Sequence, residues 1–172
     1  VIWRSLSNAQ LLEDTLADFI LFLSNERETQ KDRSQSIGGR ISVLMDYLRS
    51  HRCLLILDNA ETLMQSGAQA GRYREGYEDY GELLKRVGEI SHQSCLVLTS
   101  REKPKEVASM QGTALPVRAL QLRGLSKIEA QKIFQLKGLS GSESEWQALI
   151  ERYAGNPLAL KLVATTIQDV FD

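Results

Sequence analysis

Asp58 is the side chain whose sequence neighbours best suit it to binding a metal ion. It follows directly on an apolar run, residues 54–57, which has the composition of a strand buried on both faces. Open α/β sheets bind ligands at the carboxyl ends of their strands, and one rigid carboxylate there can help to hold Mg²⁺, which prefers oxygen ligands and keeps several waters. Asp also starts turns and caps helices, so this pattern alone leaves a purely structural role open.

Arg101 follows the next apolar run, after Thr99 and Ser100. If the two runs are neighbouring parallel strands, its guanidinium lies at the same sheet edge as Asp58. The planar fork of Arg donates parallel hydrogen bonds to a phosphate, so Arg101 could report whether a terminal phosphate is present. A surface ion pair, for instance with Glu102, is the alternative.

Strands and helices alternate in the part of the chain that must position these two side chains. Residues 1–5, 53–57 and 95–99 have the composition of strands, and residues 117–122 suggest an edge-like strand with mixed faces. Apolar residues recur at helical spacing in the segments between them: Leu12, Leu16, Phe19, Ile20 and Leu23; Ile37, Ile41, Leu44, Met45 and Leu48; Leu83, Leu84, Val87 and Ile90. This order predicts an α/β fold with a parallel sheet.

Two polar segments interrupt this pattern. Residues 24–36 predict a solvated link between two helices, and residues 65–77 predict a long surface loop. Tyr73, Tyr77 and Tyr80 lie in or beside that loop near two arginines. They either form a contact surface, where Tyr and Arg are frequent anchors, or fold their rings onto the domain.

From Ser126 onward the pattern is helical only. Two helix starts have the Ser-to-Glu spacing of a capping box: Ser126 with Glu129, and Ser142 with Glu145. Gly155 suits a left-handed helix end, and Pro157 suits the first turn of the next helix. We therefore expect an α/β domain over residues 1–124 and a helical subdomain over residues 125–172.

Composition restricts the class of protein. The formal net charge of −1 over 172 residues gives no field that would favour nucleic acid or an anionic membrane. No apolar run reaches the roughly 18 residues of a membrane span. Cys53 and Cys95 lack the number and spacing of a disulfide framework or zinc site. We expect a cytoplasmic protein with no membrane or direct nucleic-acid partner.

Four segments follow one another along the chain: RCLLILDNAETL (52–63), CLVLTSREKP (95–104), LRGLSKIEAQKIF (122–134) and AGNPLALKLVA (154–164). In this order they resemble the NB-ARC family of STAND-class P-loop signalling NTPases, which includes many bacterial regulators. The resemblance implies a three-layer, parallel-sheet P-loop NTPase-like core followed by a small helical, ARC-like subdomain. It also implies ATP or ADP and Mg²⁺ as cofactors.

The resemblance assigns roles to particular residues. Asp58 matches the Walker B residue that holds Mg²⁺ through water, and Arg101 matches the sensor of the terminal phosphate. Gly155 and Pro157 match the segment whose proline packs near adenine, and a plain helix-start proline is compatible with that role. Asn59 stands where many members have a second acid, and it cannot accept a proton as a general base. Glu61 could substitute through a water, or could be an exposed acid of a first helical turn.

The phosphate-binding loop of the family is absent from this sequence. No G-x-x-x-x-G-K-[ST] occurs, and Gly38-Gly39-Arg40 lacks the preceding strand and the Lys-Ser/Thr of that motif. In the family this loop precedes the strand that residues 1–6 resemble, so the chain is expected to lack the first strand and the loop. The chain alone should then bind ATP weakly or not at all, and backbone between the strands at 95–99 and 117–122 should be unpaired.

These expectations favour a chain that is part of an ATP/ADP-dependent signalling switch, within a parent protein that is a slow ATPase. Its partners would be nucleotide, other domains of the parent, and further copies of the protein on activation. The alternative is a non-catalytic scaffold for protein interaction or self-assembly, in which nucleotide is irrelevant.

Overall fold

The computed structural model describes residues 1–24, 36–67 and 71–171. Contacts divide the chain into two compact units, Val1–Ala119 and Leu120–Asp172. Each unit has its own hydrophobic core. The boundary expected from the sequence, between residues 124 and 125, falls inside the second unit.

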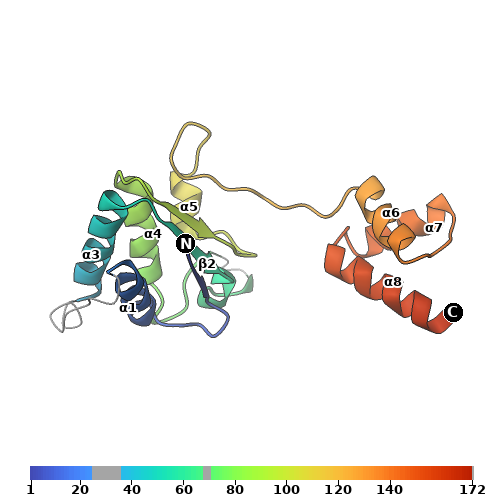
Figure 1. Ribbon diagram of the computed structural model, residues 1–172, viewed down its shortest axis with the longest axis horizontal. Coiled ribbons are helices and arrows are strands. Elements are labelled where there is room, and N and C mark those ends of the chain that lie inside the picture. Colours follow the sequence, from blue (N-terminus) through green and yellow to red (C-terminus); the bar gives the residue numbers. More distant parts are fainter. Residues whose placement is uncertain (25–35, 68–70, 172) are drawn as a thin grey trace. The chain divides into compact units, whose positions relative to one another are not determined.

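Strands and helices alternate in the first unit, as the sequence predicts (Figure 1). The strands at residues 1–5, 53–57 and 95–99 and the three helical patterns are confirmed to within a few residues. Most of the predicted link at residues 24–36 lies outside the described residues. In chain order the elements are β1 Ile2–Ser5, α1 Leu12–Leu23, α3 Ile37–Ser50, β2 Leu54–Asp58, the 3₁₀ helix η1 Ala60–Leu63, α4 Asp79–Glu89, β3 Cys95–Leu98 and α5 Lys105–Met110.

The three strands form one parallel sheet in the order β1-β2-β3. Going along the chain, each new strand pairs with the previous one and extends the sheet in the same direction. Because crossovers between parallel strands are almost always right-handed, such an order sends every connecting helix to the same face of the sheet. The buried face agrees with this: Ile2, Leu55 and Leu57 form one core with the apolar faces of α1, α3 and α4, which lie together on one side of the strands (Figure 1).

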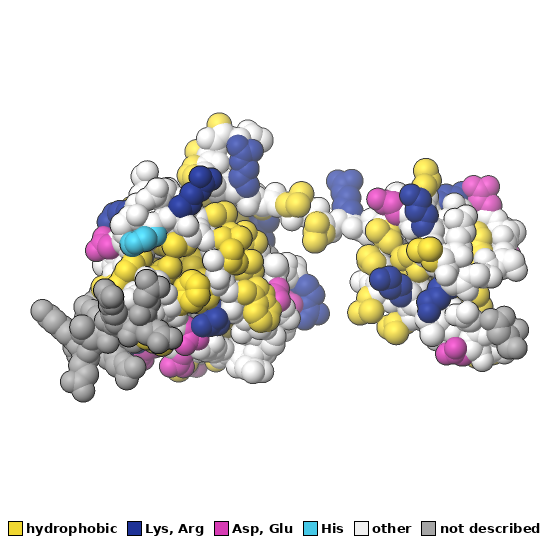
Figure 2. Space-filling model, viewed as in Figure 1, with side chains coloured by type: hydrophobic (Ala, Val, Ile, Leu, Met, Phe, Trp, Pro, Cys, Tyr) yellow, Lys and Arg dark blue, Asp and Glu magenta, His cyan; other side chains and the backbone are white. Residues whose placement is uncertain are grey.

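The opposite face of the sheet carries exposed apolar side chains. Trp3, Ile56 and Val97 lie side by side in the register, and Trp3 is 51% and Val97 42% exposed. Figure 2 shows hydrophobic side chains gathered on the surface of this unit. Parallel sheets are usually buried on both faces. The described residues of this unit therefore supply one helical layer against the sheet, where the family resemblance implies two.

The prediction of a strand at residues 117–122 is wrong. Val117 makes only an isolated bridge with Gln111, and the residues after it have no regular structure. Leu120 and Leu122 are 86% and 85% exposed. In the described part of the sheet β3 pairs with β2 alone. A strand with mixed faces is stabilised by its neighbour, and in the described part of the chain the only strand pairing that residues 117–122 make is the isolated bridge at Val117.

The tyrosines near the loop at residues 65–77 pack onto the first unit. Tyr73 and Tyr80 are buried, and the Tyr80 hydroxyl lies 2.7 Å from Thr15 Oγ1 and donates to the Gln10 carbonyl at 2.9 Å. Tyr77 donates to the Ala9 carbonyl at 2.8 Å. The alternative of rings folded onto the domain is confirmed, and these rings do not form the predicted contact surface.

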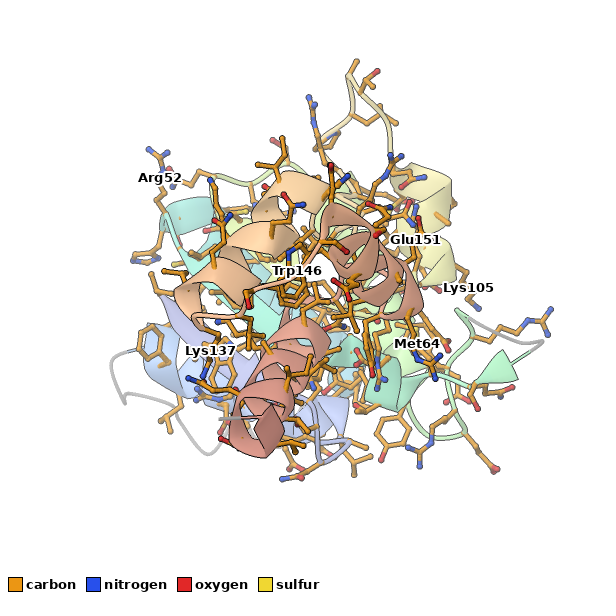
Figure 3. The ribbon with its side chains drawn as sticks, turned by 90° about the vertical axis from the view of Figure 1, so that its right-hand side faces the viewer. Arg52, Met64, Lys105, Lys137, Trp146 and Glu151 are labelled. Carbon is orange, nitrogen blue, oxygen red and sulfur yellow. The ribbon has the colours of Figure 1, made fainter. Side chains whose placement is uncertain are left out.

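The described part of the second unit has three helices: α6 Lys127–Leu136, α7 Glu143–Arg152 and α8 Pro157–Phe171. Both predicted capping boxes are present, at Ser126 and Ser142. Trp146 lies between the helices (Figure 3) and stacks on Phe134 with the ring centroids 4.6 Å apart. The core is completed by Ala130, Ile150, Leu160 and Ala164.

A close backbone approach fixes the turn between α7 and α8. Gly155 is left-handed, with φ of 66°, and its carbonyl accepts the Leu125 N–H at 2.8 Å. A Cβ on Gly155 would lie 2.6 Å from the Leu125 oxygen. The Asn156 side chain then caps α8 by accepting the N–H groups of Leu158 and Ala159 at 3.0 and 3.1 Å. Pro157 is the first residue of α8, so its expected role as a helix-start proline is confirmed.

We expect Gly155→Ala to destabilise the second unit more than Gly138→Ala. Both glycines have positive φ, but among the described residues nothing lies within 4 Å of the Cβ position of Gly138. The control substitution should cost about 1–2 kcal/mol through backbone strain alone. Gly155→Ala should cost roughly twice as much, because the Leu125 backbone must also move. The measurement is urea unfolding followed by Trp146 fluorescence in a Trp3→Phe background, and equal costs would contradict the role given to close approach.

Candidate functional site

The candidate site lies where the three strands of the sheet end. Ser5 pairs in register with Asp58, and Thr99 follows β3 next to it because Leu57 pairs with Leu98. Ser100 and Arg101 come directly after. The parallel order of β2 and β3 thus brings the two residues singled out in the sequence, Asp58 and Arg101, to the same edge of the sheet.

Thr99 fixes the Asp58 carboxylate. Its hydroxyl donates to Asp58 Oδ1 and accepts the Asn59 N–H at 3.1 Å. The Thr99 carbonyl accepts the Ala60 N–H at 2.9 Å. The Thr99 side chain at the end of β3 therefore holds in place the backbone that leaves β2. This role of Thr99 was not predicted from the sequence; its position directly after an apolar run, like that of Asp58, is the signal that could have indicated it.

Asn59 turns the chain from β2 into η1. It has left-handed geometry, with φ of 64° and ψ of 42°, a conformation that Asn tolerates better than most residues. The family resemblance compares position 59 with an acid. In this structure the position serves a tight turn, and that turn aims Glu61 toward the end of β3.

Glu61 contacts Arg101 through both carboxylate oxygens. Its Oε1 accepts from Arg101 Nε at 2.9 Å, and its Oε2 accepts the Arg101 backbone N–H at 3.3 Å. The Glu61 side chain is only 14% exposed, whereas that of Arg101 is 86% exposed. Glu61 is an acid of the first turn of η1, as one alternative expects, but the expectation that it is exposed is wrong. Arg101 thus forms an ion pair, as the alternative expects, but with Glu61. Glu102, the partner suggested as an example, instead accepts the Gly71 N–H at 3.3 Å.

The pKa of Glu61 lies below its ordinary value. Burial by itself would raise this pKa, but hydrogen bonds from the Glu61 and Arg101 backbones and from the Arg101 guanidinium, with the charge of Arg101, outweigh it. The carboxylate is thus held ionised beside the guanidinium at neutral pH.

Oxygen donors at this edge suit a hard cation. They are the Asp58 carboxylate and the hydroxyls of Ser5 and Thr99. Across residues 1–24, 36–67 and 71–171, no cluster of three or more His, Cys, Asp or Glu side chains could hold a metal ion. One carboxylate with water and phosphate oxygens is a common way to bind Mg²⁺, and this donor set fits that mode.

The other two residues proposed from the sequence, Gly155 and Pro157, belong to the second unit. Gly155 makes its backbone hydrogen bonds within that unit, and Pro157 is exposed. Pro157 thus presents its ring to solvent at the start of α8.

The chain is 54% identical over 173 residues to an uncharacterized WD repeat-containing protein, alr2800, of Nostoc sp. (strain PCC 7120). The match includes the whole of this chain and 14% of the relative's length. No protein-family model matches the chain, and neither does any solved structure.

Within the described ranges, no helix is both long and apolar enough to cross a bilayer.

We expect Thr99→Val to destabilise the first unit by about 1 kcal/mol, because the Asp58 carboxylate and the Asn59 N–H each lose a hydrogen-bond partner. Thr99→Ser, which keeps the hydroxyl, is the matched control and should cost less. The measurement is urea unfolding followed by Trp3 fluorescence in a Trp146→Phe background. A double-mutant cycle with Asp58→Ala should show a coupling of about 0.5–1.5 kcal/mol, and strictly additive costs would contradict the link between Thr99 and Asp58.

Proposed function

We propose that this chain is the Mg²⁺- and terminal-phosphate-sensing part of a nucleotide-dependent signalling switch of the STAND NTPase type. The observation that carries the proposal is the juxtaposition of Asp58 and Arg101 at the ends of adjacent parallel strands. Thr99 and Glu61 hold these two side chains in place. A carboxylate and a guanidinium at the same sheet edge are together complementary to a magnesium-bound phosphate.

Each residue has a distinct part in this proposal. Asp58 would hold Mg²⁺ through water, while the metal neutralises charge on the phosphates. Arg101 would donate to the terminal phosphate and so distinguish ATP from ADP. Asn59 supplies no proton acceptor, so hydrolysis would be slow, and the identity of the bound nucleotide would carry the signal.

The fold proposed with this function is a P-loop NTPase core with an ARC-like helical subdomain. A strand carrying the phosphate loop would pair with the open edge of β3, and a helix would cover Trp3 and Val97 on the exposed face. Gly155 and Pro157 would contribute to an adenine site. Such a switch would work in the cytoplasm, and this chain without a phosphate loop would bind nucleotide weakly.

The repeat named in the Nostoc relative is compatible with this proposal. Switches of this type are often joined to repeat domains that sense a signal, and the relative's name includes WD repeats. That architecture is inferred for this protein by analogy with the relative and with the resembled family.

A non-catalytic scaffold is the second candidate function. The exposed apolar face at Trp3 and Val97 favours it, since large apolar patches often mark interaction sites. In that case the link between Thr99 and Asp58 would be purely structural and nucleotide would have no effect.

The discriminating experiment measures Mg²⁺-dependent binding of ATP and ADP by calorimetry. It uses this chain and a version extended by any residues its gene encodes before Val1. We expect Asp58→Asn to remove the dependence on Mg²⁺. Arg101→Ala should weaken ATP binding about tenfold or more, the size of a lost hydrogen bond to a charged group, and should change ADP binding little.

Arg118→Ala is the control, because Arg118 is also exposed but does not follow a strand at this edge. Its affinities should match those of the unmodified protein. If neither version binds nucleotide, or if Asp58→Asn and Arg101→Ala leave binding unchanged, the switch proposal is wrong and the scaffold is favoured.

A further inference from the structure

We propose that Glu61 is a positioning residue for Arg101. Glu61 binds the Nε side of the guanidinium and stays paired with it when a phosphate binds, and we call this pairing the clamp. This inference rests on the proposed function, since it concerns how Arg101 would recognise the terminal phosphate. It assigns Glu61 neither the role of general base nor that of a competitor that must release Arg101.

The contacts of the clamp leave the far side of the guanidinium available. Glu61 accepts from Nε at 2.9 Å and from the Arg101 backbone N–H at 3.3 Å. The guanidinium has five N–H donors, and four of them belong to the two Nη groups. Within the described ranges these Nη groups donate no hydrogen bond, and the side chain is 86% exposed. The Nη end can therefore donate two parallel bonds to a phosphate while Nε stays with Glu61.

The backbone that carries Glu61 is held in place by burial and by a hydrogen bond. It lies in η1, whose Ala60 and Leu63 are 2% and 1% exposed. The Ala60 N–H donates to the Thr99 carbonyl at 2.9 Å, so η1 is tied to the end of β3 two residues before Arg101. A carboxylate on η1 therefore fixes both the backbone and the side chain of Arg101. A long, exposed Arg would otherwise sample many rotamers and lose that freedom on binding.

The same contacts make Glu61 a poor general base. Hydrogen bonds from Arg101 to both carboxylate oxygens stabilise the ionised form of Glu61. The pKa of Glu61 is accordingly lowered, which makes this carboxylate a weaker proton acceptor. Because Glu61 also neutralises the charge of Arg101, the pair would recognise a phosphate through the geometry of the Nη donors more than through net charge.

The clamp can be tested first without any ligand. In ¹⁵N NMR spectra of the whole chain, the Arg101 Nε–H signal should be resolved and protected from exchange. Glu61→Gln, which keeps an acceptor oxygen, should retain much of that protection, whereas Glu61→Ala should lose it. An unprotected Nε–H in the unmodified chain would overturn the inference whatever nucleotide does.

The second arm adds ATP with Mg²⁺, and separately pyrophosphate, to the chain and to its amino-terminally extended version. The Nη signals should shift while the Nε–H signal keeps its protection. Arg101→Ala should lower ATP affinity about tenfold with Glu61 present, but less than about threefold in a Glu61→Ala background. Without Glu61, the Arg101 side chain must lose more conformational freedom when it binds, so it contributes less to affinity.

The possible outcomes separate this inference from the proposed function. Tighter ATP binding by Glu61→Ala, or loss of Nε–H protection on binding, would identify a competitor and overturn the clamp alone. Normal binding with hydrolysis abolished in Glu61→Gln would identify a base and also overturn it. Failure of every version to bind either ligand would overturn the proposed function, and with it the role of the clamp in phosphate recognition.

Discussion

The register between β2 and β3 is the constraint on which the candidate site depends. It places Asp58 beside Thr99, so that a single hydroxyl can bind the carboxylate and also accept the N–H of the next residue. The turn at Asn59 and the position of η1 follow from those bonds. Glu61 reaches Arg101 only because η1 is held against the end of β3. Slipping the register by one residue would reverse the faces of the strand and separate these groups.

A second consequence of the sheet order is its uneven covering. Strands added in one direction with right-handed crossovers receive all their helices on one face. Ile2, Leu55 and Leu57 are buried there, while Trp3 and Val97 are exposed on the other face. The polar row of Ser5, Asp58 and Thr99 continues that exposed face at its carboxyl end, since residues two apart in a strand share a face. Anything that covers the apolar rows would therefore also lie beside the candidate site.

The sequence predicts the order of elements well, because local signals determine them. The apolar runs before Asp58 and Thr99 form strands, and both serine capping boxes form as their spacing indicates. Residues 117–122 show the limit of such signals, since a strand also needs a neighbour to pair with. The sequence could not reveal how many helical layers cover the sheet, because that depends on the direction in which strands are added.

Prediction of the site has a similar limit. That Asp58 and Arg101 lie at one edge can be reasoned from parallel strands, but the pairing of Glu61 with Arg101 joins residues forty positions apart. No periodic pattern connects them. The most direct test of a nucleotide site at this edge is paramagnetic relaxation by Mn²⁺, a substitute for Mg²⁺, in the presence of ATP. We expect the amide signals of residues 58–60 and 99–101 to broaden most, and broadening centred elsewhere, or identical with and without ATP, would contradict a magnesium-nucleotide site at Asp58.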